Sequence, residues 1–221
     1  MKRNLFFMAI AVTVIAFMAS CGGNKQENKD KPAQDTTVKV NKTVENLKAA
    51  LKGETTASAK YDAFAKKAKE EGQIQISKLF EAASKSESIH AGNHKKVLEE
   101  MGEKAEVQPD TFSVKTTKEN LEAAVKGETY EVQTMYPGFI TQAQTDNADK
   151  AVKSFNWAFD TEKKHVKMYQ AALDAFNAKK TKSLASQYFV CPKCGFTYDA
   201  KDVQNECELC GTEKAKYIVI K

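Results

Sequence analysis

The segment NLKAALKGET, residues 46–55, recurs 74 residues later as NLEAAVKGET, residues 120–129, with eight of ten positions identical. Its leucine, alanine and valine residues return at spacings of three and four, which is the period of one helix face. Both copies carry a glutamate at the same place, Glu54 in the first and Glu128 in the second. The repeat therefore predicts two related helices, each with one carboxylate at an equivalent position.

A second pattern recurs at almost the same interval. Glu87-x-x-His90 is followed 75 residues later by Glu162-x-x-His165. Residues three apart lie on one helix face about one turn apart, so each pair presents a carboxylate and an imidazole together. A single such pair is common on a solvated helix face. Two pairs in register with two repeated glutamates indicate a metal site, since the chain has only three histidines and two of them fall in the pattern.

The spacing of these residues also predicts where the helices turn. Ligands on two antiparallel helices meet when both lie equally far from the connecting turn. For Glu54 and Glu87 the midpoint lies beside Gly72, and for Glu128 and Glu162 it is Thr145. At ~1.5 Å per helical residue, each ligand level lies roughly 25 Å from its turn, deep inside a bundle.

The rest of the helical region fits this arrangement. Residues 42–178 are predicted to form a mainly α, four-helix bundle, with residues 102–115 as the connection between its two hairpins. Thr116-x-x-Glu119 has the spacing of a capping box and marks the start of the third helix. Pro137 is expected to bend that helix near Met135 and Tyr136.

Two CxxCG motifs follow a short polar linker, residues 179–187. Cys191, Cys194, Cys207 and Cys210 have the spacing of a tetrahedral thiolate site, in which each glycine permits a positive φ. Short strands are predicted at 188–190 and 217–220, so residues 188–221 form a small metal domain. The cysteines alone fit iron and a structural zinc ribbon about equally.

The N-terminus has the pattern of an export signal. Residues 1–20 contain Lys2 and Arg3, then an apolar run and Ala19-Ser20 directly before Cys21. The pattern is similar to a bacterial lipoprotein signal, with Cys21 as the lipidated residue; an ordinary signal peptide is the alternative. Residues 21–41 are expected to be a flexible tether. The net charge of +5 is spread among many acids, so nucleic-acid binding is not indicated.

From residue 42 to the C-terminus the chain resembles the rubrerythrin family, in which a ferritin-like di-iron bundle precedes a rubredoxin-like Fe(Cys)4 domain. The resemblance implies that two irons are held by Glu54, Glu87, His90, Glu128, Glu131, Glu162 and His165. It implies that Glu131 and His90 exchange at one iron between redox states. It also implies that the hydroxyls of Tyr61 and Tyr136 steady the carboxylates, although core tyrosines are the alternative.

Two further residues bear on these expectations. Placed after a di-iron bundle, the cysteine quartet favours iron, although Glu208 stands where a rubredoxin knuckle usually has proline. His94 lies one turn after His90, where we expect it near the metal site or at the surface and not as a ligand.

The resemblance implies an enzyme that reduces hydrogen peroxide to water in oxidative-stress defence. The Fe(Cys)4 centre would pass on electrons from an unidentified donor, and the protein is expected to be a homodimer. The signal sequence predicts a lipid-anchored protein of the cell envelope. The alternatives are a ferroxidase or iron-handling protein, and a non-catalytic electron-transfer or metal-binding lipoprotein with a zinc-ribbon tail.

Overall fold

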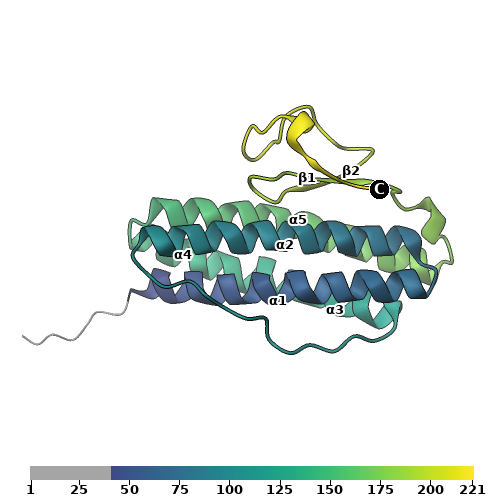
Figure 1. Cartoon of the computed structure of the whole chain (residues 1–221), viewed down its shortest axis with the longest axis horizontal. Coiled ribbons are helices and arrows are strands. Elements are labelled where there is room, and N and C mark those ends of the chain that lie inside the picture. The colour runs from purple at the N-terminus through teal and green to yellow at the C-terminus, as the bar shows by residue number, and fades with distance from the viewer. Residues whose placement is uncertain (1–40) are drawn as a thin grey trace, which may run out of the picture. The chain divides into compact units, whose positions relative to one another are not determined.

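The computed structural model describes residues 41–221, in which four long helical segments lie side by side and a small sheet follows (Figure 1). The leader, Cys21 and nearly all of the predicted tether lie outside the described residues. The helices are α1 (Lys42–Glu70), α2 (Ile74–Glu100), α3 (Thr117–Tyr130), α4 (Tyr136–Thr145) and α5 (Asp149–Asn177). Among the described residues, no helix is both long and apolar enough to span a bilayer.

Both hairpin turns fall where the ligand spacing predicted them. Helix α1 ends at Glu70 and α2 begins at Ile74, with Gly72 between them at a φ of +74°. Helix α4 ends at Thr145, and Asn147 in the following turn has a φ of +53°. Glycine and asparagine adopt this left-handed conformation at little cost, so both turns close without strain.

The start and the interruption of the third helical segment also follow from local chemistry. Thr116 forms the predicted capping box, in which its hydroxyl accepts from the Glu119 N–H and the Glu119 carboxylate accepts from the Thr116 N–H. The segment is interrupted by a π-helical turn, η1 (Glu131–Met135), and α4 then begins with Pro137 in its first turn. A π turn therefore lies directly before Pro137, at the place where a bend was expected.

Apolar side chains fill the bundle above and below the level of the predicted ligands. One cluster includes Phe64, Phe80 and Leu121, and the other includes Leu47 and Phe155. Along each helix the glutamates and histidines of the repeat lie between residues of these two clusters. The polar level is therefore enclosed by packed hydrocarbon at both ends, which excludes water.

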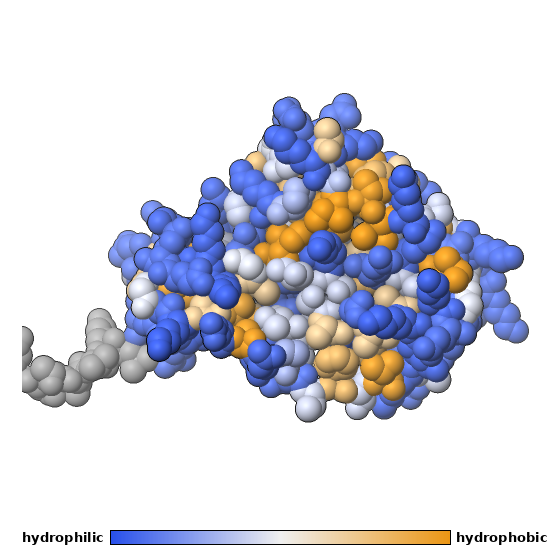
Figure 2. All heavy atoms as spheres, in the orientation of Figure 1, coloured by the Kyte–Doolittle hydropathy of each residue, from blue (hydrophilic) through white to orange (hydrophobic). Residues whose placement is uncertain are grey.

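The C-terminal segment forms a three-stranded antiparallel sheet of order β2-β1-β3. Its elements are η2 (Thr181–Ser183), β1 (Tyr188–Val190), β2 (Thr197–Asp199), η3 (Lys214–Lys216) and β3 (Ile218–Ile220). Strands β1 and β3 were predicted, whereas β2 was not. On the face drawn in Figure 2, hydrophilic side chains cover most of the helices and hydrophobic ones gather over the C-terminal sheet.

Candidate metal centres

The four helical segments bring six of the predicted ligands together in the centre of the bundle. Two overlapping sets form, each with ligand atoms within 4.8 Å of one another. One set is Glu54, Glu87, His90 and Glu162; the other is Glu87, Glu128, Glu162 and His165. The sets share two glutamates, one from each half of the repeat, as a pair of metal ions bridged by carboxylates requires.

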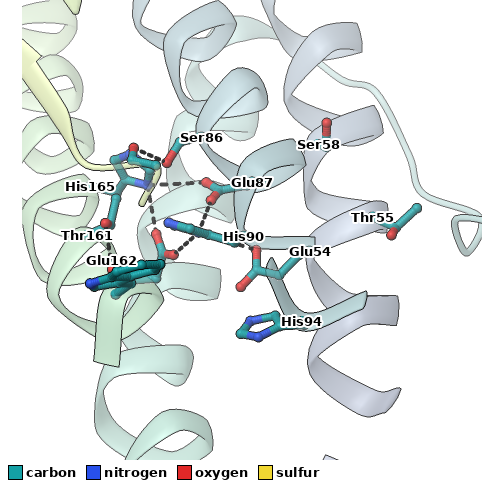
Figure 3. Close-up of polar contacts among 12 residues, drawn as sticks. Glu54, Thr55, Ser58, Ser86, Glu87, His90, His94, Thr161, Glu162 and His165 are labelled. Carbon is teal, nitrogen blue, oxygen red and sulfur yellow. Dashed lines mark hydrogen bonds and ion pairs between the residues drawn. The ribbon is translucent and has the colours of Figure 1, made fainter. Parts of the chain in front are cut away.

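Each histidine faces both shared glutamates (Figure 3). His90 Nδ1 lies 3.0 Å from Glu87 Oε2 and 2.9 Å from Glu162 Oε1. His165 Nδ1 lies 2.7 Å from Glu162 Oε2 and 3.2 Å from Glu87 Oε1. The i,i+3 spacing supplies one short distance of each pair, and the packing of α2 against α5 supplies the other.

The donor set fits metal ions, because its polar atoms lack other partners. The six side chains are at most 2% exposed. Although several atoms lie close together, no hydrogen bond within residues 41–221 satisfies Nδ1 of either histidine, either oxygen of Glu87 or Glu162, or the second oxygen of Glu54 and Glu128. Buried polar atoms are costly without partners, so these convergent unpartnered atoms fit bound cations.

The charge of the set leads to the same conclusion. Burial and neighbouring carboxylates raise the pKa of Glu54 and of Glu128 well above the usual value. Burial lowers the pKa of His165, but Glu87 and Glu162 outweigh it and raise the pKa to about 10. The cluster thus draws in protons when no metal is present. Two divalent ions would balance the four carboxylates of the two sets.

Two tyrosine hydroxyls reach the glutamates that are not shared. Tyr61 Oη donates to Glu128 Oε1 at 2.5 Å, and Tyr136 Oη donates to Glu54 Oε1. Both rings are buried. Each hydroxyl fixes one carboxylate oxygen and leaves the other directed at the ligand set, which is the geometry that the predicted role requires.

Glu131 belongs to neither set. It opens the π turn and is partly exposed, and its carboxylate is close enough to Glu54 to raise the pKa of that residue. Burial, followed by the charge of Glu128, raises the pKa of Glu131 itself. His90 therefore occupies the ligand set and Glu131 does not, and their exchange remains a prediction.

The four cysteines form a second site. Their sulfurs lie within 4.8 Å of one another, and Sγ of Cys191 and Cys210, like Sγ of Cys194 and Cys207, are 3.5 Å apart. None of the four is in a disulfide. Ligands ~2.3 Å from a tetrahedral metal lie roughly 3.7 Å apart, so the cluster has the size of an Fe(Cys)4 or Zn(Cys)4 centre. Gly195 and Gly211 have the predicted positive φ, +85° and +68°.

The two sites meet through the segment that follows Cys194. Thr197 Oγ1 lies 3.0 Å from His165 Nε2 and donates to the Gly195 carbonyl at 3.3 Å, so the imidazole N–H donates to the threonine. The Ser86 hydroxyl donates to the same carbonyl at 2.7 Å. Gly195 lies so close to His90 that a Cβ there would overlap the Nε2 atom of the ring. Both histidines of the ligand set thus contact the cysteine domain of the same chain.

These contact residues could not be recognised from the sequence patterns. Ser86 and Thr197 carry no motif, and Gly195 was assigned only a role in its own knuckle. A signal was present for Ser86, because it lies one turn before His90 on a helix whose ligand face was already identified.

His94 is buried and is not in either ligand set, as expected from its position. Its partners are Tyr136 and Ser154, of which Ser154 was not predicted to have any role.

Comparisons with known proteins identify relatives over most of the chain. Residues 45–173 match the family model described as rubrerythrin. Nigerythrin of Nitratidesulfovibrio vulgaris is 39% identical over 180 residues, covering 80% of this chain and 85% of that protein. Rubrerythrin-2 of Clostridium acetobutylicum is 32% identical over 182 residues, covering 82% of this chain and 98% of the relative.

Solved structures agree with these matches. Nigerythrin in its fully reduced, all-ferrous state superposes with a TM-score of 0.73 at 36% identity, covering 85% of this chain and 91% of that one. A bacterioferritin of Mycobacterium tuberculosis is similar with a TM-score of 0.58 at 17% identity, which shows a shared fold alone. The donor sets described above fit two irons in the bundle and a rubredoxin-like iron in the cysteine site.

Proposed function

Because this chain belongs to the rubrerythrin family, we propose that it is a non-haem di-iron peroxidase. It reduces hydrogen peroxide with two electrons and two protons to two molecules of water, in defence against oxidative stress. The electrons come from the cysteine site, which an unidentified donor reduces in turn. Held by the glutamates and histidines of the two ligand sets, ferrous iron would supply the electrons and the Lewis acidity for cleavage of the O–O bond.

One observation carries this proposal: the cysteine domain contacts the histidines of the carboxylate cluster. Thr197 hydrogen-bonds His165, and Gly195 packs against His90, within a segment that begins at the ligand Cys194. A store of iron needs no such input, and a structural zinc tail would gain nothing from touching the metal ligands. The contact supports electron transfer from one centre to the other.

The chain's own residues prepare the site for this reaction. The apolar clusters on both sides exclude bulk water, which strengthens electrostatic interactions in the site. The Tyr61 and Tyr136 hydroxyls hold the terminal glutamates in place, and Thr197 holds the His165 ring. Each of these contacts restricts a ligand before any metal or peroxide binds, so little reorganisation accompanies the reaction.

The test is the metal content and visible spectrum of anaerobically purified protein, before and after one equivalent of peroxide. We expect about three irons per chain, and thiolate-to-iron bands that bleach on reduction and return when peroxide is added. The Cys207→Ser variant should retain the di-iron site but lose these bands. Two irons with one zinc and no thiolate bands would instead support an iron-handling or structural role.

We also propose that Cys21 is lipidated and anchors the protein at the cell envelope, where it meets external peroxide. This rests on the sequence pattern of residues 1–21. Fractionation of cells that express the full chain should place it in the membrane fraction, and Cys21→Ala should release it. Recovery of the unaltered chain in the cytoplasmic fraction would contradict the proposal.

We retain the homodimer as a proposal that follows from family membership. The contacts between the cysteine domain and the ligand cluster are made here within one chain. Sedimentation equilibrium of the metal-loaded protein tests whether two copies associate.

A further inference from the structure

A continuous chain of hydrogen-bonding groups leads from the ligand cluster to a surface pocket. His94 is fully buried on α2, and both of its ring nitrogens have partners. Nε2 lies 3.2 Å from Tyr136 Oη, and Nδ1 lies 2.8 Å from Ser154 Oγ. Tyr136 in turn donates to Glu54 Oε1. Three side chains from three helices are thus connected in a single file that ends at a ligand carboxylate.

The end of this hydrogen-bonded row that lies farthest from Glu54 borders a surface pocket. Ser154 is 4% exposed and lines a pocket of about 280 Å³. The pocket lies between α2, α5 and the cysteine domain, with Asn93, Trp157 and Lys193 also on its wall. Ser154 is therefore the member of the row that borders the pocket, whereas His94 and Tyr136 do not line it.

In the row from Ser154 to Glu54, each group donates its hydrogen bond toward the ligand cluster. Tyr136 uses its only proton on Glu54, so its oxygen can only accept from His94. His94 must then carry its proton on Nε2, and its bare Nδ1 accepts from Ser154. Burial, with a smaller effect of His90, lowers the pKa of His94 to about 3. His94 is therefore a neutral imidazole, with one nitrogen that donates to Tyr136 and one that accepts from Ser154.

The internal repeat supplies a comparison for these residues. Seventy-five residues separate Glu87 from Glu162, and the same shift takes His94 to Tyr169 and Ser154 back to Leu79. Tyr169 and Leu79 are both buried, and the Tyr169 hydroxyl has no hydrogen-bond partner in the described part of the chain. The bundle is therefore packed at the related positions without a histidine or a serine. Within residues 41–221, the Glu54 side of the site has this chain of hydroxyl and imidazole groups and the Glu128 side does not.

We propose that Ser154, His94 and Tyr136 form a proton relay from the surface pocket to the Glu54 carboxylate. The proposal rests on the proposed peroxide reduction, which consumes two protons inside a site closed to bulk water. It goes beyond that function because it assigns the route by which those protons enter.

Each passage of the relay moves one proton and no electrons. Hydronium in the pocket protonates Ser154 Oγ as the serine proton passes to His94 Nδ1. The His94 Nε2 proton passes to Tyr136 Oη, and the tyrosine proton passes to Glu54 Oε1, at the edge of the ligand set. The passage leaves His94 with its proton on Nδ1, so the starting arrangement returns when the imidazole changes back to its Nε2–H tautomer and the two hydroxyls rotate.

The first test compares variants in single-turnover reoxidation of the reduced, iron-loaded protein by peroxide, in H2O and D2O. Ser154→Ala removes the entrance, and His94→Gln retains a donor and an acceptor but cannot exchange a proton between them. Both should slow reoxidation by roughly 10²-fold and alter the solvent isotope effect. Ser154→Thr, which keeps the hydroxyl, should restore the rate.

The matched control is Ser77→Ala. This serine is also buried, but its hydroxyl donates to the Ala65 carbonyl, in the apolar part of the bundle away from the relay. Rates for Ser154→Ala and His94→Gln equal to those of Ser77→Ala would overturn the relay. If His94→Gln does not fold, the Ser154→Ala and Ser154→Thr pair decides.

A second readout needs no iron and no activity. In zinc-loaded protein, ¹⁵N NMR of the histidines should find His94 protonated on Nε2, with solvent exchange of that proton slower in Ser154→Ala than in Ser77→Ala. A proton on Nδ1, or equal exchange, would refute the relay. Wild-type protein that peroxide fails to reoxidise would refute the peroxidase proposal, and the NMR result would still decide the relay.

Discussion

Replacing Gly195 by alanine should separate the cysteine domain from the ligand cluster without removing a ligand from either site. The new Cβ would overlap His90 Nε2 and would lie 2.6 Å from His90 Cδ2. Ordinary contact begins near 3.4 Å, so the knuckle or the ring must move by roughly 1 Å. The ring cannot move freely, because its Nδ1 faces the shared glutamates.

The expected cost has two parts that a second variant separates. A side chain at a φ of +85° costs about 1–2 kcal/mol, and overpacking against a buried ring adds about 1–3 kcal/mol. Gly211 holds the same place in the other knuckle at a φ of +68°, and a Cβ there would meet no atom within 4 Å. Gly211→Ala should therefore carry the first cost alone.

The assay is denaturant unfolding of the zinc-loaded variants, combined with peroxide-driven reoxidation of the iron-loaded ones. Gly195→Ala should be less stable than Gly211→Ala by about 1–3 kcal/mol. Both variants should bind all metals, but only Gly195→Ala should lose rapid reoxidation of the thiolate-ligated iron. Equal stabilities and equal reoxidation rates would refute the contact between Gly195 and His90.

Three further predictions concern the ligands and their supports. Thr197→Val leaves His165 Nε2 buried without a partner, which should cost about 1–3 kcal/mol in thermal unfolding; an unchanged stability would show that the hydrogen bond does not form. Ser86→Ala removes one donor from the Gly195 carbonyl, and its smaller cost, about 0.5–1.5 kcal/mol, should show in the same measurement because Thr197 still donates there. In metal-free protein, folding raises the pKa of Glu54 and Glu128 above 4.5 and that of His165 above 6.5. Above these pH values the unfolded chain has lost protons that the folded protein still holds. Its melting temperature should therefore fall as the pH rises from about 5 to about 8, whereas metal binding, which requires deprotonated ligands, should increasingly stabilise the protein over that range.

The relay and the domain contact make the two halves of the repeat unequal. His90 meets a backbone glycine and His165 meets a threonine hydroxyl. Glu54 is linked through Tyr136 to a polar chain, whereas the Tyr61 ring next to Glu128 packs against Phe80 and Tyr169. A ligand set that is nearly symmetric in sequence therefore has one side hydrogen-bonded to a row of polar side chains and the other side packed against aromatic rings.

The helices, the two hairpin turns and the six bundle residues that converge in the ligand sets could be predicted from the amino-acid sequence. These features are local: the helical period places Glu87 and His90 on one face, and nearly equal distances from the turn before Gly72 bring Glu54 and Glu87 to one level. The CxxCG spacing likewise defines each knuckle without reference to the rest of the chain.

The groups that meet across the bundle became visible only in the folded chain. Ser86 and Gly195 are 109 residues apart, and His94 and Ser154 are 60 apart. No period or motif links such pairs, because their contact depends on how helices rotate and pack and on where the sheet settles. Strand β2 was missed for the same reason, since its three residues are held by pairing with β1 and by contact with α2 and α5. The candidate ligands can thus be recognised in the sequence, whereas the contacts on which the proposed proton and electron routes rest arise from packing.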